Sequence, residues 1–203
     1  MRLTAGGPVA GLARSRARGG LFLVVLSLLG VLSGGSAAAE EPRAHVVDPA
    51  RSQIRFHASS RLMDADGSFH RFGGEVRFDE GRPEAVSARV TVEVASIDTG
   101  IRMRDDHLRS EDFFHVERHP TATFVVATVS RDGERWVVIG QLTIRGVTRP
   151  LSLPATVSRA DAELRIRGEF TVNRQAFGIT YRSFLNPIRD EIRVWFDLVA
   201  SPG

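Results

Sequence analysis

The sequence predicts an all-β protein of about eight antiparallel strands. Apolar residues recur at every second position along most of the chain, which is the period of a strand with one buried face. These runs are rich in β-branched and aromatic residues, and most are joined by short turns. About eight such strands either close into a barrel, which can hold one small ligand, or pack as a solid sandwich. The pattern alone allows both.

The alternation sets the position of each expected strand. Val86 to Val94 has the cleanest two-residue period, and Asp132-Gly133 is a hairpin signal between two runs. The polar segment Met63 to Gly67 is expected to be a loop, and Gly73-Gly74 predicts a bulge or a close approach of two backbones. After a short run at 44–47, the expected strands are 53–58, 69–78, 86–94, 124–128, 136–144, 151–157, 164–172 and 192–198.

Two longer interruptions, near residues 97–119 and 173–188, break this series of strands. In the first, Pro120 pushes His119 toward extended geometry, so a helical or turn segment should end there and a strand begin. The few large apolar residues among many charges are Ile101, Leu108, Phe113 and Phe114. The segment from Arg104 to Phe124 is therefore expected to be a short helical cap that places these side chains on an opening in the β structure.

The same segment contains candidate metal ligands. They are His107, His115, His119, Asp105, Asp106 and Asp112. His115 and His119 have the i, i+4 spacing that zinc sites use on helices. However, Pro120 follows at once, and arginines alternate with the carboxylates, which is typical of solvated salt bridges. We therefore expect no metal.

The first 39 residues have the order of a secretory signal peptide. Residues 1–20 are basic, residues 21–32 are an unbroken apolar run, and Ala37-Ala38-Ala39 offers a cleavage site. The alternative, an uncleaved anchor, is disfavoured because a membrane span needs about 20 apolar residues. We expect a signal peptide at 1–39, one domain at 40–203, and a periplasmic protein.

Composition narrows the classes of partner. Removing the four arginines of the leader takes the net charge from +3 to −1. The net charge therefore gives no reason to expect a nucleic acid or an anionic membrane as a partner. The chain has no cysteine, which excludes disulfides and attachment through a lipoprotein cysteine.

An ordered set of motifs runs through residues 40–203. It comprises Asp48-Pro49 with Ser52, Ile54 and Phe56; Gly67-Ser68-Phe69 with Phe72 and Gly74; Asp105, His107-Leu108, Ser110 and Asp112-Phe113-Phe114; His119-Pro120 with Phe124; Gly140, Leu142-Thr143-Ile144, Gly146-Val147-Thr148 and Pro150; Asn173-Arg174 with Phe177-Gly178; and Asp190. In these residues the chain resembles the YceI family of bacterial periplasmic, lipocalin-like proteins. Two departures are His45-Val46, where the family often has an aromatic residue, and Gln175-Ala176, where it often has an acid after the arginine.

The resemblance implies an eight-stranded antiparallel lipocalin-like barrel with short helical segments capping the opening. It also implies a non-enzymatic carrier that encloses a long-chain isoprenoid (a polyprenyl chain or an isoprenoid quinone) or a similar amphiphilic lipid. Homodimers, transient contact with a membrane and a part in a stress response belong to the same hypothesis. No cofactor other than the bound lipid is expected.

The residues themselves favour an apolar ligand. The chain has 12 phenylalanines and 1 tyrosine. Phenylalanine lacks the hydroxyl group of tyrosine, so an inner surface rich in phenylalanine offers few hydrogen-bonding groups to a ligand. Packed core is the ordinary explanation of phenylalanine at strand spacing, and the resemblance favours a lined cavity. The predicted ligand-binding residues are Phe56, Phe78, Val90, Val92, Phe113, Phe114, Phe124, Leu142, Phe170, Arg174, Phe177, Val194 and Phe196.

Arg174 is expected at the rim, where it would pair with a ligand head group or with the acids near 105–112. The alternative is a structural salt bridge that pins the two interruptions together. Motifs of an enzyme are missing from the sequence: there is no cysteine nucleophile, GxSxG, phosphate-binding glycine loop or HExxH. The alternative to a carrier is a structural or partner-binding β domain without a ligand cavity.

Overall fold

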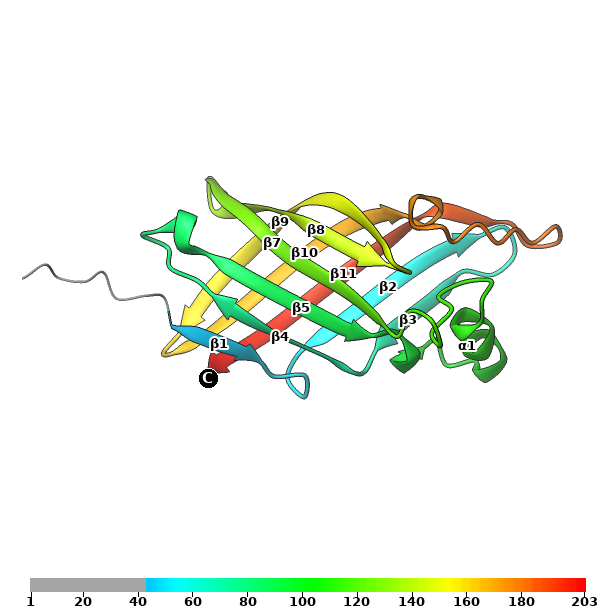
Figure 1. Ribbon diagram of the computed structural model, residues 1–203, viewed down its shortest axis with the longest axis horizontal. Coiled ribbons are helices and arrows are strands. Elements are labelled where there is room, and N and C mark those ends of the chain that lie inside the picture. The colour runs from blue at the N-terminus through cyan, green and yellow to red at the C-terminus, as the bar shows by residue number, and fades with distance from the viewer. Residues whose placement is uncertain (1–42) are drawn as a thin grey trace, which may run out of the picture. The chain divides into compact units, whose positions relative to one another are not determined.

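The structure is a computed structural model that describes residues 43–203, and the expected signal peptide at 1–39 lies outside the described residues. The described residues form one antiparallel sheet of 11 strands that closes on itself (Figure 1). The strands are β1 (Ala44–Val47), β2 (Gln53–Ser60), β3 (Ala65–Phe69), β4 (Phe72–Arg77), β5 (Ser87–Glu93), β6 (Ile97–Asp98), β7 (Thr121–Asp132), β8 (Arg135–Ile144), β9 (Val147–Ala160), β10 (Glu163–Asn173) and β11 (Ile188–Pro202). The helices in this range are α1 (Arg102–Arg109) and the 3₁₀ turns η1 (Pro83–Ala85), η2 (Val94–Ser96) and η3 (Arg174–Phe177).

The sheet closes because β1 pairs with both β4 and β11. The ring then runs β1-β4-β5-β7-β8-β9-β10-β11 and returns to β1. The remaining three strands continue members of this ring: β2 extends β1 along β11, β3 extends β4 along β2, and β6 extends β5 along β3. The fold is therefore a closed eight-stranded antiparallel barrel, as predicted, and the sandwich alternative is wrong.

The predicted loop at Met63 to Gly67 is wrong over its second half, because β3 begins at Ala65. The first four residues of β3, Ala65 to Ser68, are small or polar, so they lack the alternating apolar signal, and their pairing with β2 places them in the sheet. Of the two alternatives predicted for Gly73-Gly74, the structure has no bulge, since β4 pairs with β5 in regular register through both glycines. The expected close approach is confirmed: a methyl group on Gly74 would lie 2.4 Å from the backbone oxygen of Arg89.

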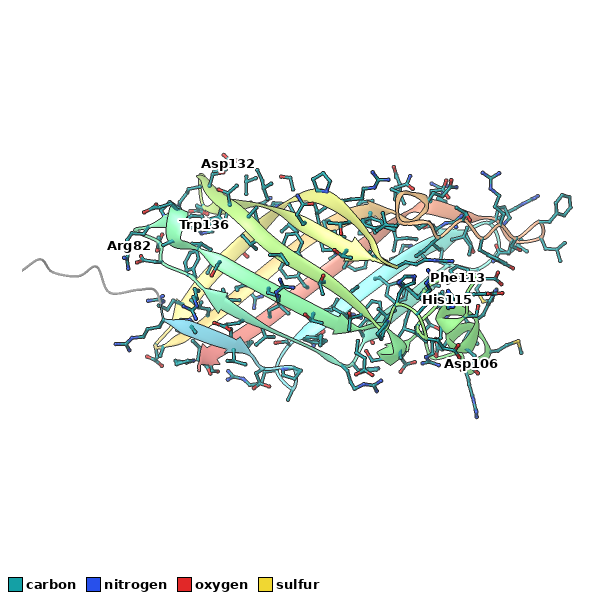
Figure 2. All side chains as sticks on the ribbon, viewed as in Figure 1. Arg82, Asp106, Phe113, His115, Asp132 and Trp136 are labelled. Carbon is teal, nitrogen blue, oxygen red and sulfur yellow. The ribbon has the colours of Figure 1, made fainter. Side chains whose placement is uncertain are left out.

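One end of the barrel is filled by side chains. The buried core cluster there consists of Val47, Ile54, Val76, Leu164, Leu198 and Ala200. Trp136 is buried next to it and meets Phe78 edge-on, with ring centroids 5.2 Å apart. Trp136 lies at the opposite end of the barrel from Phe113 and His115 (Figure 2). This cluster closes the Trp136 end of the barrel and leaves the other end for the cap.

Glycines on the inner wall give space to phenylalanine rings. Gly67 pairs directly with Phe56, and a methyl group on Gly67 would lie 2.4 Å from Cζ of Phe56. Gly168 stands in the same relation to Phe196, again with 2.4 Å between the two positions. A ring that covers a glycine on the neighbouring strand lies along the wall, as in aromatic rescue of sheet glycines. These rings therefore line the interior without filling it.

Candidate functional site

The hollow end of the barrel contains a cavity of about 770 Å³. A second cavity of about 160 Å³ lies nearer the filled end and has Trp136 in its wall. The residues that line both spaces, and so stand between them, are Ile54, Val92, Ala122, Leu142, Phe170 and Val194. Both linings are dominated by aliphatic and aromatic side chains, which are the walls that suit an apolar ligand.

Every predicted ligand-binding residue lines one of these cavities. Phe56, Phe113, Phe114, Arg174 and Phe177 line the larger cavity alone. Phe78, Val90, Phe124 and Phe196 line the smaller one alone. Val92, Leu142, Phe170 and Val194 line both. For those in strands, alternation placed the side chains on one face, and barrel closure turned that face inward. Phe113 and Phe114 reach the cavity from the turns after α1, and Arg174 and Phe177 reach it from η3.

The predicted cap is present and is held by polar contacts with the preceding chain. α1 ends at Arg109, turns follow as far as Pro120, and β7 begins at Thr121. The Asp105 carboxylate is buried and accepts hydrogen bonds from the backbone N–H of Thr99 at 2.9 Å and from its hydroxyl. Arg109 donates to the carbonyl oxygens of Ala95 and Ile97, at 2.9 and 2.6 Å. These bonds fix α1 over the larger cavity, where Leu108 reaches the lining.

Three rings meet at the mouth of the larger cavity. His107 lies edge-on to Phe113 and to Tyr181, with ring centroids 5.0 and 4.8 Å apart, and Phe113 lies 4.9 Å from Tyr181. The imidazole Nε2 of His107 is 3.0 Å from the Asp112 carboxylate. Arg145 donates to the carbonyl oxygen of Phe113 at 2.6 Å, which ties the cap to the β8–β9 turn. His107 and Tyr181 thus present polar-tipped rings where an otherwise apolar lining meets solvent.

Arg174 lines the cavity, but its predicted pairing with the acids near 105–112 is wrong. The side chain is 6% exposed and donates to the carbonyl oxygens of Ile179 and Tyr181, each at 2.9 Å. Its guanidinium also lies 2.9 Å from the Asp190 carboxylate. The arginine therefore holds the irregular segment between β10 and β11 in place by bonding to its backbone and to the start of β11. The pairing differs because backbone carbonyls beside Arg174 in sequence satisfy most of its donors.

Sequence reasoning missed part of the lining. The missed residues include Ile54, Phe69, Ile97, Ile179 and Tyr181. Ile54 lies two positions before Phe56 on the same strand face, so the two-residue period that predicts an inward Phe56 also predicts an inward Ile54. Ile179 and Tyr181 lie in the irregular segment between η3 and β11, where no repeating pattern marks the inward side.

The histidines of the cap do not form the helical pair that their spacing suggested. His115 lies beyond the end of α1 and has a positive φ of 50°. Its ring meets that of His119 edge-on, with centroids 5.9 Å apart. Burial lowers the pKa of His119, and the nearby charges of Arg118, His115 and Arg145 act in the same direction. Within residues 43–203 no three His, Cys, Asp or Glu side chains are grouped as metal ligands.

A closed antiparallel barrel that is filled at one end and hollow under a helical cap at the other defines the lipocalin-like class of β-barrels. The chain belongs to the YceI family: residues 45–200 match the model of the YceI-like domain. In the described part of the chain, no helix has the length and apolar character needed to cross a bilayer.

Curated relatives carry the same family name or a related one. A UPF0312 protein of Photorhabdus laumondii is 45% identical over 89 residues, which cover 44% of this chain and 46% of that protein. A UPF0312 protein of Pectobacterium carotovorum is 37% identical over 134 residues, or 63% of this chain and 69% of that protein. Protein YceI of Escherichia coli is 43% identical over 89 residues and is covered to 47%. The chain thus spans about half the length of the Photorhabdus and Escherichia relatives that it matches.

Solved structures share the fold over most of the chain. The crystal structure of BcnA from Burkholderia cenocepacia has a TM-score of 0.72 and 30% sequence identity, and the match covers 76% of this chain and 99% of that chain. A polyisoprenoid binding domain from Saccharophagus degradans has a TM-score of 0.67 and 18% identity, with coverage of 79% and 99%. The second likeness supports the fold alone.

Proposed function

We propose that this protein is a non-enzymatic carrier that encloses the chain of an isoprenoid, or of a similar amphiphilic lipid, in its barrel. The observation behind this proposal is the apolar cavity of about 770 Å³ under the cap. Ligand cavities in proteins have volumes of about 300–1,000 Å³ and are lined mainly by apolar side chains with a few polar groups. We take the ligand class from the description of a solved structure of the same fold, a polyisoprenoid binding domain from Saccharophagus degradans.

The arrangement of the lining gives the ligand a direction. The tail would lie along the inner wall past Phe56 and Phe170 toward the smaller cavity. The head group would stay at the mouth, beside His107 and Tyr181. Arg174 is a weaker candidate for head-group contact because its guanidinium is already bonded to carbonyl oxygens and to Asp190. A head group left at the mouth adds less affinity than the tail, so lipids with different heads should compete for one site.

Affinity should depend on the length of the tail. Burial of apolar groups yields at most about 0.8 kcal/mol per CH₂, so one five-carbon unit offers roughly 3–4 kcal/mol before losses of motion are subtracted. We expect affinity to rise with each added unit and to level off once both cavities are full. The measurement is a titration of lipid-free protein with isoprenoids of increasing length and one common head group. Phe114→Asp, at the cavity mouth, should weaken binding of every member of the series.

An affinity that does not change with tail length would contradict the carrier proposal, as would the absence of binding in protein shown to be lipid-free and folded. The latter result would favour a structural or partner-binding β domain. The cavity under the cap argues against that alternative, because a domain with a solid core would not contain it.

The proposal includes export. The expected signal peptide at 1–39 and cleavage after Ala39 would deliver the domain at 40–203 to the periplasm, where a soluble carrier could move a lipid between membranes. Homodimers and a part in a stress response stay hypotheses drawn from the family resemblance.

A further inference from the structure

The mouth of the barrel is surrounded by exposed apolar side chains on three separate segments. These are Leu62 and Met63 between β2 and β3, Ile101 and Met103 at the start of α1, and Phe184 and Leu185 before β11. Phe184 is 98% exposed, Met103 82% and Leu62 71%. Single exposed apolar residues are ordinary, but a contiguous group marks an interaction site. Figure 1 shows the β2–β3 turn, α1 and the segment before β11 at the same end of the barrel.

Hydrogen bonds and a ring contact join the three segments into one surface, which we call the apolar rim. The backbone N–H of Leu62 donates to the Asn186 side chain at 2.8 Å, and that of Arg61 donates to the carbonyl oxygen of Pro187. The His107 ring of α1 lies against Tyr181, in the segment before β11. Met63, Ile101 and Met103 also line the larger cavity, so the rim and the cavity lining are continuous.

Each segment of the rim also carries an exposed arginine, and one exposed acid, Asp64, follows the first segment. The segments read Arg61-Leu62-Met63, Ile101-Arg102-Met103 and Arg182-Ser183-Phe184-Leu185. Two carboxylates lie beside the rim: Asp64 accepts from the backbone N–H of Ser60 at 2.8 Å, and Asp106 pairs with Arg109 at 3.1 Å and with Arg102 at 3.9 Å. Arg61 and Arg182 form no ion pair within residues 43–203, so they carry the positive charge of the rim. The net charge sums over the whole domain, so it does not reveal the positive charge of the arginines at the rim.

We propose that the apolar rim docks on an anionic lipid surface with the mouth of the barrel facing the bilayer. Exposed apolar side chains would enter the boundary between head groups and acyl chains, while Arg61 and Arg182 contact lipid phosphates. A second copy of the chain is a poorer occupant, because rim-to-rim contact would set like charges against each other. Docking does not depend on the proposed carrier function. If the barrel does carry a lipid, docking lets the apolar ligand enter the cavity without crossing water.

The test uses protein beginning at Glu40, which contains every strand of the barrel, and vesicles without isoprenoid. We expect it to cosediment with vesicles of phosphatidylcholine and phosphatidylglycerol, and much less with phosphatidylcholine alone. Phe184→Ala combined with Leu185→Ala should weaken binding by about tenfold or more, since both side chains leave the lipid. Arg61→Gln combined with Arg182→Gln should weaken only the phosphatidylglycerol-dependent part, and added salt should mimic that change.

Matched controls lie on the barrel wall and at its filled end. Ile139→Ala removes an exposed apolar side chain of β8, and Arg159→Gln removes an exposed arginine near the β9–β10 turn. Neither should change vesicle binding. Phe184→Trp supplies a reporter at the rim, and its fluorescence emission should shift to the blue when vesicles are added.

Three results would overturn the inference. They are no vesicle binding, equal vesicle binding by the rim and control variants, or a dimer that does not bind vesicles and that the rim substitutions dissociate. Affinity for geraniol in solution separates docking from the carrier function, because Phe184 and Leu185 do not line the cavity. Rim variants that bind geraniol normally but lose vesicles support docking. Vesicle binding by a protein that takes no prenyl alcohol would reject the carrier and keep the docking surface.

Discussion

Arg174 organises the irregular segment between β10 and β11. The segment has no ladder partners over most of its length, so its carbonyl groups need another donor. The buried guanidinium supplies it to Ile179 and Tyr181, and Asp190 balances its charge. Both η3 and the cavity wall formed by Ile179 and Tyr181 therefore depend on one side chain.

Replacing Arg174 by alanine should lower stability more than it lowers ligand affinity. Removal leaves buried carbonyls without donors and one carboxylate without its partner, which costs about 2–4 kcal/mol. Arg174→Lys should recover part of this loss, because lysine keeps the charge but not the planar fork of donors. Chemical denaturation measures the free energy of unfolding. The exposed Arg189→Ala is the control and should change it little.

A loss of lipid affinity larger than the loss of stability would show that Arg174 contacts the head group directly. The sequence could not decide between these roles. An arginine after an apolar run marks the end of a strand. Every residue has a backbone carbonyl, however, so the sequence does not reveal which carbonyl oxygens accept hydrogen bonds from Arg174.

At the scale of the element, the structure differs from the sequence prediction at β3. Apolar alternation located the other barrel strands, except the two-residue β6, because their inward side chains are large. In β3 the inward position opposite Phe56 is Gly67, and the ring of Phe56 occupies the space that its side chain would take. Reading one strand alone cannot reveal this exchange, since the apolar group belongs to the neighbouring strand.

Gly67→Ala should therefore reduce the capacity of the larger cavity. The new methyl group would lie 2.4 Å from Cζ and 2.6 Å from Cε1 of Phe56, so the ring must move into the lumen. Overpacking of this kind costs about 1–3 kcal/mol. Titration with a long isoprenoid should show weaker binding, and Phe56→Leu in the same chain should restore part of it.

Gly73→Ala is the matched control, because no other group lies within 4 Å of the methyl position there. It should leave binding unchanged and stability equal or slightly higher, since alanine restricts the unfolded chain more than glycine does. Equal effects at Gly67 and Gly73 would mean that the loss comes from the backbone and not from Phe56.

At the scale of the whole molecule, the sequence predicted which side chains face inward but not how much space they leave. The same alternation describes Leu164, in the filled end, and Phe56, in the wall of the cavity. Whether inward side chains meet depends on barrel closure and on ring orientation, both of which involve residues far apart in the chain. The cap was predictable because Pro120 marks its end, whereas its anchoring by Asp105 and Arg109 depends on contacts with backbone groups.

The filled end is tied together by one ion pair that joins three parts of the chain. Arg51, between β1 and β2, donates to both oxygens of the Glu163 carboxylate, at 2.5 and 2.8 Å, and Ser201 in β11 donates to it at 2.9 Å. The hydrogen bonds from Arg51 and Ser201 lower the pKa of Glu163 from 4.5 to about 2. A carboxyl with a lower pKa in the folded state binds a proton more readily when the chain unfolds.

Glu163 should therefore stabilise the barrel in full above pH 4.5, and its contribution should disappear as the pH falls toward 2. Glu163→Gln keeps the shape but removes the charge, so its urea midpoint should lie below that of the unchanged protein at neutral pH. The two midpoints should converge over that acidic window, and high salt should narrow the gap because the pair is exposed. Glu134→Gln, whose side chain forms no ion pair among the described residues, is the control. A gap at neutral pH that persists at the acidic end of the window would mean that Glu163 acts through neutral hydrogen bonds, and that its charge does not hold the filled end together.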